Sequence, residues 1–234
     1  ENGSMVDGPG VRFVIFMAGC PLRCQFCHNP DTWNIKSGKE TELKDLLKQI
    51  EKSKNFIKSA KGGVTISGGE PLLQKEFLEN LLLEIKKLDL ETAVDTSGFL
   101  VDNLSQTIID NTDLFLLDIK SFNYETYEYI TKGKLENTIK FLDILEKHGK
   151  KTWIRVVLVP QLNDNLEDLK EMSNYLKEKK NIEFVEILPF HKFGEFKWKE
   201  SKLDYKLYDT KPPSKDLIEK VKNIFINDGL KVKV

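Results

Sequence analysis

Residues 61–88 read KGGVTISGGEPLLQKEFLENLLLEIKKL, and this stretch contains the pattern that decides the fold. Its short run of β-branched and small residues, Gly63–Ser67, predicts a buried strand. After Gly68 and Gly69, the segment Lys75–Leu88 carries apolar residues at helical spacing with Lys and Glu between them, which predicts an amphipathic helix. A strand followed by such a helix is the repeating unit of a parallel α/β sheet.

The same unit recurs about six times along the chain. Strands are predicted at Arg12–Ala18, Gly63–Ser67, Glu91–Thr96, Leu114–Ile119, Thr152–Val159 and Ile182–Leu188. Amphipathic helical segments are predicted at Glu40–Lys58, Lys75–Leu88, Leu135–Lys147 and Leu166–Lys177. Six units are too few for the eight-fold closed barrel, so we expect an α/β fold with an open, partial (β/α)6 TIM-like barrel and a parallel sheet.

The C-terminal part of the chain departs from this repeat. We expect a last helix at Ser214–Asn227 and a short strand after Gly229, whereas the Pro- and Lys-rich stretch Lys192–Pro213 predicts an irregular surface excursion. No linker-like or repeated segment divides the sequence. We therefore expect residues 1–234 to form one domain, a size that barrel folds commonly reach undivided.

The charge balance excludes some classes of partner. The chain has 36 basic and 37 acidic residues, so no long-range positive field can gather nucleic acid, and we expect no nucleic-acid partner. No apolar run approaches the roughly 20 residues that span a bilayer, so no membrane association is expected. Residues Glu1–Gly10 lack the basic-then-apolar order of a secretory signal, and we expect a cytoplasmic protein.

All three cysteines of the chain, Cys20, Cys24 and Cys27, lie within eight residues. An odd number of cysteines clustered in this way argues against a disulfide framework and favours metal binding. The spacing lets three thiolates converge on one metal corner. A closed iron–sulfur cluster would need a fourth cysteine, so one iron would stay open to a small ligand, as catalysis requires.

Two alternatives remain open for the cysteine segment. The first is a zinc site completed by His28, although structural zinc sites usually draw their ligand pairs from separate segments. The second is a set of unrelated buried thiols, for which a polar loop is a poor setting. Either a zinc site or a closed cluster would make the protein a metal-binding or electron-transfer module without catalysis.

The cysteine segment carries a family resemblance. Residues 20–33, CPLRCQFCHNPDTW, have the spacing of the radical S-adenosylmethionine (SAM) superfamily, with Phe26 as the aromatic residue before the third cysteine. The chain resembles in particular the pyruvate formate-lyase activating enzymes. That likeness extends over the strings VDGPGVRF, TISGGEPLLQ, DTSGF, LFLLDIK, WIRVVLVP and EILPFHKFGEFKW.

The resemblance implies a mechanism and partners. Cys20, Cys24 and Cys27 would hold a 4Fe–4S cluster whose open iron binds SAM and cleaves it reductively to a 5′-deoxyadenosyl radical. This radical would take the α-hydrogen of a glycine in pyruvate formate-lyase, with flavodoxin or ferredoxin as the electron donor. Asn29–Gly68 contains no cysteine, so a single cluster is implied. The alternatives are a radical SAM enzyme acting on a small molecule and an activase of a different glycyl radical enzyme.

The resemblance also implies a set of SAM-binding residues: Phe26, Gly68, Gly69, Glu70, Asp95, Thr96, Asp118, Lys120, Arg155 and His191. Glycines at Gly68 and Gly69 allow close backbone approach, and the Glu70 carboxylate can pair with the SAM ammonium group. The alternative for these three residues is an ordinary strand-to-helix turn with an N-terminal acid. Arg155 interrupts an apolar strand, which is costly unless its guanidinium meets a carboxylate or a ligand.

The remaining assignments concern a cation and the substrate. Asp95, Thr96 and Asp118 offer hard oxygen ligands, and in the resembling activases the matching positions hold a monovalent cation. Helix N-caps and strand-end hydrogen bonds are the alternative for Asp95 and Thr96. His191 would lie near the SAM nucleoside, or else be a satisfied loop histidine. Asp7, in Asp7-Gly8-Pro9-Gly10, would contact the substrate peptide, with a plain turn as the alternative. His28 and Asn29 are candidates for further contacts.

Overall fold

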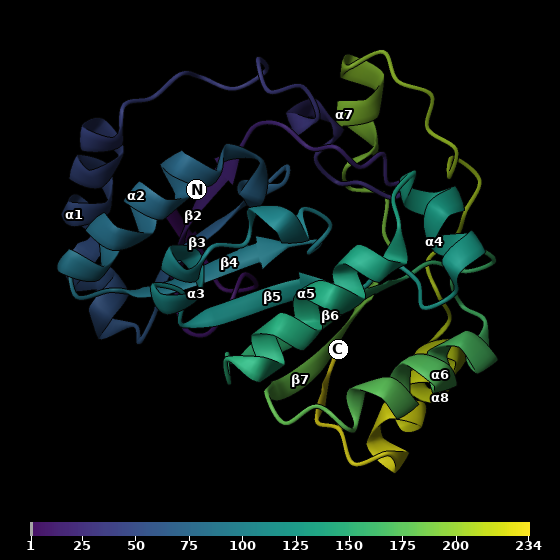
Figure 1. Ribbon diagram of the computed structural model, residues 1–234. Coiled ribbons are helices and arrows are strands. Elements are labelled where there is room, and N and C mark those ends of the chain that lie inside the picture. Colours follow the sequence, from purple (N-terminus) through teal and green to yellow (C-terminus); the bar gives the residue numbers. More distant parts are fainter. Residues whose placement is uncertain (1) are drawn as a thin grey trace. The chain divides into compact units, whose positions relative to one another are not determined.

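A computed structural model of the protein describes residues 2–234, and Glu1 lies outside the described residues (Figure 1). The strands are β1 (Asn2–Ser4), β2 (Arg12–Met17), β3 (Gly63–Gly68), β4 (Glu91–Thr96), β5 (Leu114–Asp118), β6 (Thr152–Leu158), β7 (Ile182–Pro189) and β8 (Val232–Lys233). They follow one another in the sheet in chain order, with β1 and β8 as edge strands. Strand β1 is antiparallel to β2. The pairings β2–β3, β3–β4, β6–β7 and β7–β8 are parallel, which confirms the predicted α/β class with an open, mostly parallel sheet.

Helices connect the strands. The α-helices are α1 (Leu43–Ser59), α2 (Lys75–Lys87), α3 (Gln106–Asp110), α4 (Tyr124–Thr131), α5 (Leu135–Lys147), α6 (Leu166–Leu176), α7 (Glu195–Glu200) and α8 (Lys215–Asn227). Short 3-10 turns are η1 (Pro30–Thr32), η2 (Pro71–Gln74) and η3 (Val101–Asn103). Among residues 2–234, no helix has both the length and the apolar character needed to cross a membrane.

The chain forms two compact units. The first unit holds the chain up to Pro21 together with Thr32–Thr96 and Leu100–Leu116. The second unit holds Leu22–Asp31, Ser97–Phe99 and Leu117–Val234.

In the first unit, helices pack on the strands through one apolar stripe. Helix α2 buries Leu78, Leu81, Leu82 and Ile85, which lie on one face because a helix repeats every 3.6 residues. It lies beside α1 in Figure 1 and contacts α3 and β4. Each fully buried aliphatic side chain contributes about 1.5–3 kcal/mol of favourable transfer free energy, so the apolar face of α2 stabilises the unit.

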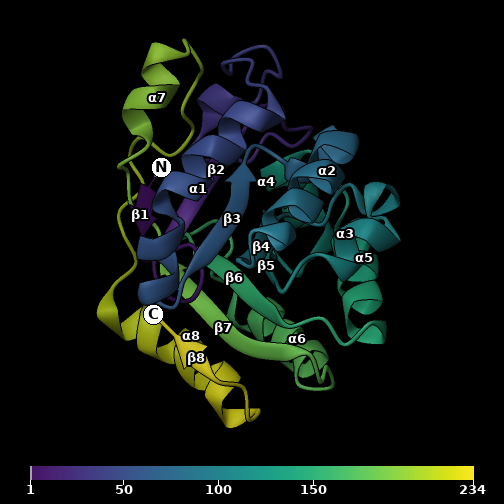
Figure 2. The same cartoon turned by 90° about the vertical axis from the view of Figure 1, so that its left-hand side faces the viewer.

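In the second unit, β6 and β7 form the longest parallel pairing, and Arg155 of β6 lies opposite Glu186 of β7. Helices α6 and α8 lie side by side next to these strands (Figure 2). Helix α8 begins at a serine cap, because the Ser214 hydroxyl accepts a hydrogen bond from the Leu217 N–H. Strand β8 is held at its end by Lys233, whose Nζ lies 3.6 Å from the Trp153 ring centroid.

The six predicted strands are all present, and their ends differ from the predicted ones by at most one residue. The prediction for Lys192–Pro213 was wrong in part. This segment contains α7, and it buries Trp198 and Leu207, which are 4 % and 6 % exposed. A helix of six residues is too short to show a helical repeat in the sequence, which is why α7 was missed.

Candidate functional site

The three cysteines are shared between the two units. Cys20 follows β2 in the first unit, whereas Cys24 and Cys27 belong to the second. None of the three takes part in a disulfide, and Cys24 is buried. Within either unit taken alone, the described residues contain no group of three His, Cys, Asp or Glu side chains that could hold a metal ion. The thiols themselves are the soft donors that an iron–sulfur cluster requires.

Gly68 and Gly69 join β3 to the residue before Cys20. The Gly69 N–H donates to the Met17 carbonyl at 2.7 Å, and the Glu70 N–H donates to the Gly19 carbonyl at 2.8 Å. A Cβ atom on Gly69 would lie 2.3 Å from the Gly19 oxygen, and Gly68 has a φ of +112° that side chains disfavour. Both glycines are therefore needed for the close backbone approach that fixes the start of the cysteine loop.

Glu70 is 1 % exposed and has its carboxylate held in place. Its Oε1 accepts hydrogen bonds from Thr96 Oγ1 at 2.6 Å and from the Leu72 N–H at 3.3 Å, and it caps η2. The interpretation as a strand-to-helix turn with an N-terminal acid is thus correct for this oxygen. The same bonds give the carboxylate the fixed orientation that recognition of an ammonium group needs.

Asp95 and Thr96 are the last two residues of β4. Asp95 Oδ2 accepts a hydrogen bond from Ser67 Oγ at 2.6 Å, so the ends of β3 and β4 are linked twice, through Ser67–Asp95 and through Glu70–Thr96. Thr96 Oγ1 donates its proton to Glu70, and a hydroxyl oxygen is also the kind of hard donor that a cation binds.

Asp118, Lys120 and Phe26 lie together in the second unit. The Lys120 ammonium forms an ion pair with Asp118 at 2.7 Å and lies 5.7 Å from the centroid of the Phe26 ring. Phe26 itself is 4 % exposed and belongs to an apolar cluster with Ile130, Val159, Phe190 and Leu207. The cation assignment uses Asp118 as an oxygen ligand. In this structure its carboxylate is paired with the positive charge of Lys120.

Arg155 meets a carboxylate in the next strand. Its Nε donates to Glu186 Oε2 at 2.9 Å, and the two side chains are 8 % and 15 % exposed. The pairing offsets the cost of burying the guanidinium. Glu186 was missed in the sequence, although its place in a strand directly opposite Arg155 follows once the register of the two parallel strands is known.

The loop that carries Cys24 and Cys27 is held by α4 and α7. The Arg23 and Gln25 N–H groups donate to carbonyls at the end of α4, those of Thr131 and Ile130, at 2.7 and 3.1 Å. From α7, Trp198 Nε1 donates to the Cys27 carbonyl at 2.8 Å. The Lys197 ammonium donates to Asn29 Oδ1 at 2.7 Å. Trp198 and Lys197 were missed as site residues because no local pattern relates them to the cysteine loop, which lies 171 and 168 residues away from them in the chain.

The rings of His28 and His191 pack against each other at an interplanar angle of 32°. Their ring centroids are 4.4 Å apart, and His28 Nε2 lies 3.2 Å from the His191 carbonyl oxygen. A carbonyl oxygen can only accept, so this contact favours the tautomer in which His28 Nε2 carries the proton. Burial and the neighbouring His191 lower the pKa of His28 below its ordinary value of 6.5. His191 thus has a structural partner in the cysteine loop.

The remaining predicted residue, Asp7, lies in the first unit between β1 and β2 and is half-buried. Its carboxylate accepts a hydrogen bond from Ser4 Oγ.

Within the first unit, the structure brings together Gly68, Gly69, Glu70, Asp95 and Thr96. Within the second unit, it brings Phe26 to Lys120, His28 to His191 and Arg155 to Glu186.

Comparison with known proteins gives consistent matches. Residues 14–176 match the family model of the radical SAM superfamily. The pyruvate formate-lyase-activating enzyme of Clostridium pasteurianum is 45 % identical over 222 residues, which cover 94 % of this chain and 92 % of that protein. The pyruvate formate-lyase 1-activating enzyme of Escherichia coli K12 is 38 % identical over 234 residues, 99 % and 95 % of the two chains.

A solved structure resembles this one in fold. The crystal structure of Streptococcus suis SuiB bound to its precursor peptide SuiA matches with a TM-score of 0.71 over 97 % of this chain and 49 % of that one. The sequence identity is 19 %, so this likeness bears on the fold alone.

Proposed function

Because the chain belongs to the radical SAM superfamily, in which its close relatives are pyruvate formate-lyase-activating enzymes, we propose that it installs the glycyl radical of pyruvate formate-lyase. The observation that carries this proposal is the similarity to those relatives over nearly the whole of both chains. A shared domain alone would leave the substrate open.

The family implies a 4Fe–4S cluster and SAM, and the residues of this chain fit both. Cys20, Cys24 and Cys27 would hold the cluster through three thiolates, leaving one iron for the amino and carboxylate groups of SAM. When bound, the cluster and SAM supply one-electron cleavage of the sulfonium, which ends with a glycine α-hydrogen on 5′-deoxyadenosine, free methionine and a glycyl radical.

The chain's own residues bind and orient. Glu70, fixed by Thr96 and the Leu72 N–H, would receive the SAM ammonium group without having to reorganise. Gly68 and Gly69 would keep side chains out of the same turn. Arg155 and His191 are proposed to line the SAM pocket, Arg155 with its charge already balanced by Glu186.

A monovalent cation is proposed at Asp95, Thr96 and Asp118. The oxygen chemistry of the three side chains supports it, since hard ligands suit a hard cation. Lys120 would then compensate the charge of Asp118 whenever the cation is absent.

Two partners complete the proposal. The substrate is the glycine loop of pyruvate formate-lyase, which Asp7 would contact, and the electron donor is a flavodoxin or a ferredoxin. A second candidate function, a radical SAM enzyme acting on a small molecule, would share the cysteine loop and the Gly-Gly-Glu turn. No specific contact among the described residues favours it.

The test is anaerobic incubation of reduced, reconstituted protein with SAM and pyruvate formate-lyase, followed by electron paramagnetic resonance. We expect about four irons per chain and a glycyl signal. SAM cleavage without a glycyl signal would favour the small-molecule enzyme, and stoichiometric zinc without SAM cleavage would exclude both. The Cys24→Ala variant is the control: it should lose SAM cleavage, since a cluster ligand is missing.

A further inference from the structure

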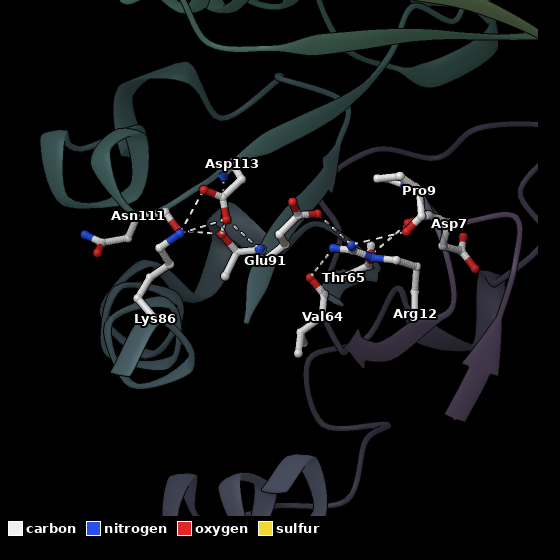
Figure 3. Close-up of polar contacts among 10 residues, drawn as sticks. Asp7, Pro9, Arg12, Val64, Thr65, Lys86, Glu91, Asn111 and Asp113 are labelled. Atoms are coloured by element: carbon white, nitrogen blue, oxygen red, sulfur yellow. Dashed lines mark hydrogen bonds and ion pairs between the residues drawn. The ribbon is translucent and has the colours of Figure 1, made fainter. Parts of the chain in front are cut away.

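A buried arginine lies beside the Asp7–Gly10 segment. Arg12 is the first residue of β2, it is 1 % exposed, and it is the largest of the fully buried side chains. Figure 3 shows its guanidinium group between Pro9 and Asp7 on one side and Val64, Thr65 and Glu91 on the other. A buried charge is costly, so the bonds of this guanidinium identify what it stabilises.

One hydroxyl connects Arg12 to Asp7. Arg12 Nε donates to Thr65 Oγ1 at 3.0 Å, and Thr65 Oγ1 donates to the Asp7 carbonyl at 2.7 Å. Thr65 is completely buried in β3. Since a hydroxyl has one proton and two lone pairs, the donation from Arg12 ensures that the Thr65 proton points to Asp7.

The other donors of the guanidinium tie the same segment to the strands. Arg12 Nη2 donates to the Val64 carbonyl at 2.9 Å, and Nη1 reaches the Pro9 carbonyl at 3.5 Å and Glu91 Oε2 at 3.9 Å. Burial lowers the pKa of Arg12 to about 10, against the opposing effect of Glu91, so the group keeps its charge at neutral pH. The rigid, planar fork of guanidinium donors binds carbonyls of the loop and of the strand at once, in a geometry that a lysine ammonium group does not match.

The backbone around Arg12 leaves room for this arrangement. A Cβ on Gly63 would lie 2.6 Å from Arg12 Nη1. Gly8 and Gly10 have φ values of +128° and +68°, and a Cβ on Gly10 would lie 2.2 Å from the Lys61 carbonyl oxygen. Glycine torsions and the bonds from Arg12 and Thr65 therefore support the observed conformation of the segment.

We propose that Arg12 and Thr65 are positioning residues for substrate binding, which fix the Asp7 carbonyl and thereby the backbone from which the Asp7 side chain meets the glycine loop of the partner enzyme. This inference rests on the proposed function. It gives Arg12 at the start of β2 and Thr65 within β3 a role in recognising the glycine loop. This role is separate from SAM binding. An apolar residue at position 12 would avoid the cost of burying a charge, but it could not hold the Pro9 carbonyl or orient the Thr65 hydroxyl.

The chain offers a matched pair of variants. Thr65→Val removes the hydroxyl that donates to Asp7, with little change in volume. Thr92→Val is the control, because Thr92 is also completely buried, lies in neighbouring β4 and donates to a backbone carbonyl, that of Asn111, at 2.6 Å. The Asn111 carbonyl belongs to the Lys86–Asp113 end of the network in Figure 3, away from Asp7. Thr65→Ser keeps the hydroxyl and should restore the wild-type behaviour.

Two measurements distinguish a positioning role of Thr65 from a purely structural one. In glycyl-radical formation, Thr65→Val should raise the KM for pyruvate formate-lyase about threefold to tenfold with a smaller change in kcat, and Thr92→Val should not. In the protein without substrate, Thr65→Val should speed amide hydrogen exchange in residues 5–11, whereas Thr92→Val should leave this segment protected. Arg12→Lys, which keeps the charge but loses the fork, should act in the same direction as Thr65→Val.

The outcomes are distinct. An equal loss of stability in Thr65→Val and Thr92→Val, with unchanged KM and unchanged exchange in residues 5–11, would mean that Thr65 is only a core residue and would overturn the inference. If wild-type protein cleaves SAM but forms no glycyl radical, the proposed function fails. Faster exchange in Thr65→Val would then support the positioning of Asp7 and leave only its substrate to be replaced.

Discussion

Thr96 Oγ1 lies 2.6 Å from Glu70 Oε1 and donates a hydrogen bond to it. Both side chains are buried, and the two residues follow different strands, Thr96 at the end of β4 and Glu70 after β3. One bond thus joins two motifs that are 26 residues apart in the chain. A carboxylate held in this way binds a cationic group without losing rotamer freedom at the moment of binding.

We predict that Thr96→Val weakens SAM binding about tenfold and lowers the free energy of unfolding by about 1–3 kcal/mol, because a buried carboxylate loses a donor. Thr96→Ser keeps the donor and is the control. Equilibrium dialysis of SAM under anaerobic conditions and urea unfolding measure the two effects. An unchanged SAM affinity in Thr96→Val would show that SAM binding does not depend on the hydrogen bond that orients Glu70.

The contact between Trp198 and the Cys27 carbonyl gives a second prediction. Trp198→Phe removes one hydrogen bond and should raise amide exchange in residues 22–31 by a factor that corresponds to about 1 kcal/mol. Trp153→Phe is a matched control in the same unit. Trp153 is 5 % exposed, against 4 % for Trp198, and its Nε1 donates to Glu183 at 3.1 Å rather than to the cysteine loop. Equal exchange in both variants would show that α7 does not hold the loop.

A third prediction concerns the buried ion pair. Glu186→Leu should lower the free energy of unfolding by about 3–5 kcal/mol, because the buried guanidinium group of Arg155 loses its charged partner in β7. The double variant Arg155→Met with Glu186→Leu should recover most of that loss. Glu167→Ala, which removes the exposed partner of Lys170, serves as the control and should change stability by less than about 1 kcal/mol. Additive losses in the double variant would refute the coupling.

Acid stability provides the fourth prediction. Burial opposes ionisation of Asp113, but hydrogen bonds from Lys86 and Thr92 outweigh it, so the pKa of Asp113 lies below its ordinary value of 3.8. An acid with a lowered folded pKa stabilises the protein above its unfolded pKa, and this contribution is lost as the pH falls through the folded pKa. Asp113→Asn should therefore be less stable than wild type at pH 7, and the difference should shrink below about pH 3.8. Urea unfolding between pH 3 and 7 measures it; a difference independent of pH would contradict the assignment.

The strands could be predicted because their amino-acid composition reflects their burial in the core. Runs such as Ala93–Val94 and Leu114–Leu117 are apolar and lie in a sheet covered by helices, so their composition is set by the core. Helix α4 was missed because its residues Tyr124–Thr131 are mostly aromatic and β-branched, which does not resemble a helix former. The helix nevertheless begins at a typical N-cap residue, Asn123, whose side chain accepts a hydrogen bond from the Thr126 N–H.

The polar partners of the site could not be predicted in the same way. That Arg155 requires a carboxylate follows from its apolar strand, but the choice of Glu186 depends on the register of two strands that are 31 residues apart. The contact of Trp198 with Cys27 spans 171 residues and depends on where a short helix packs. The SAM and cation assignments stay predictions, since they concern groups that bind to the chain and leave no mark in its hydrophobic pattern.

The close approach of Gly69 to the Gly19 carbonyl limits what mutagenesis can reveal at this turn. Any larger residue at position 69 must push apart two backbone segments before a cofactor arrives, so an inactive variant there reports a misfolded turn as readily as a lost ligand contact. Engineers who wish to alter cofactor preference should leave the double glycine alone and vary the side chains that surround the carboxylate.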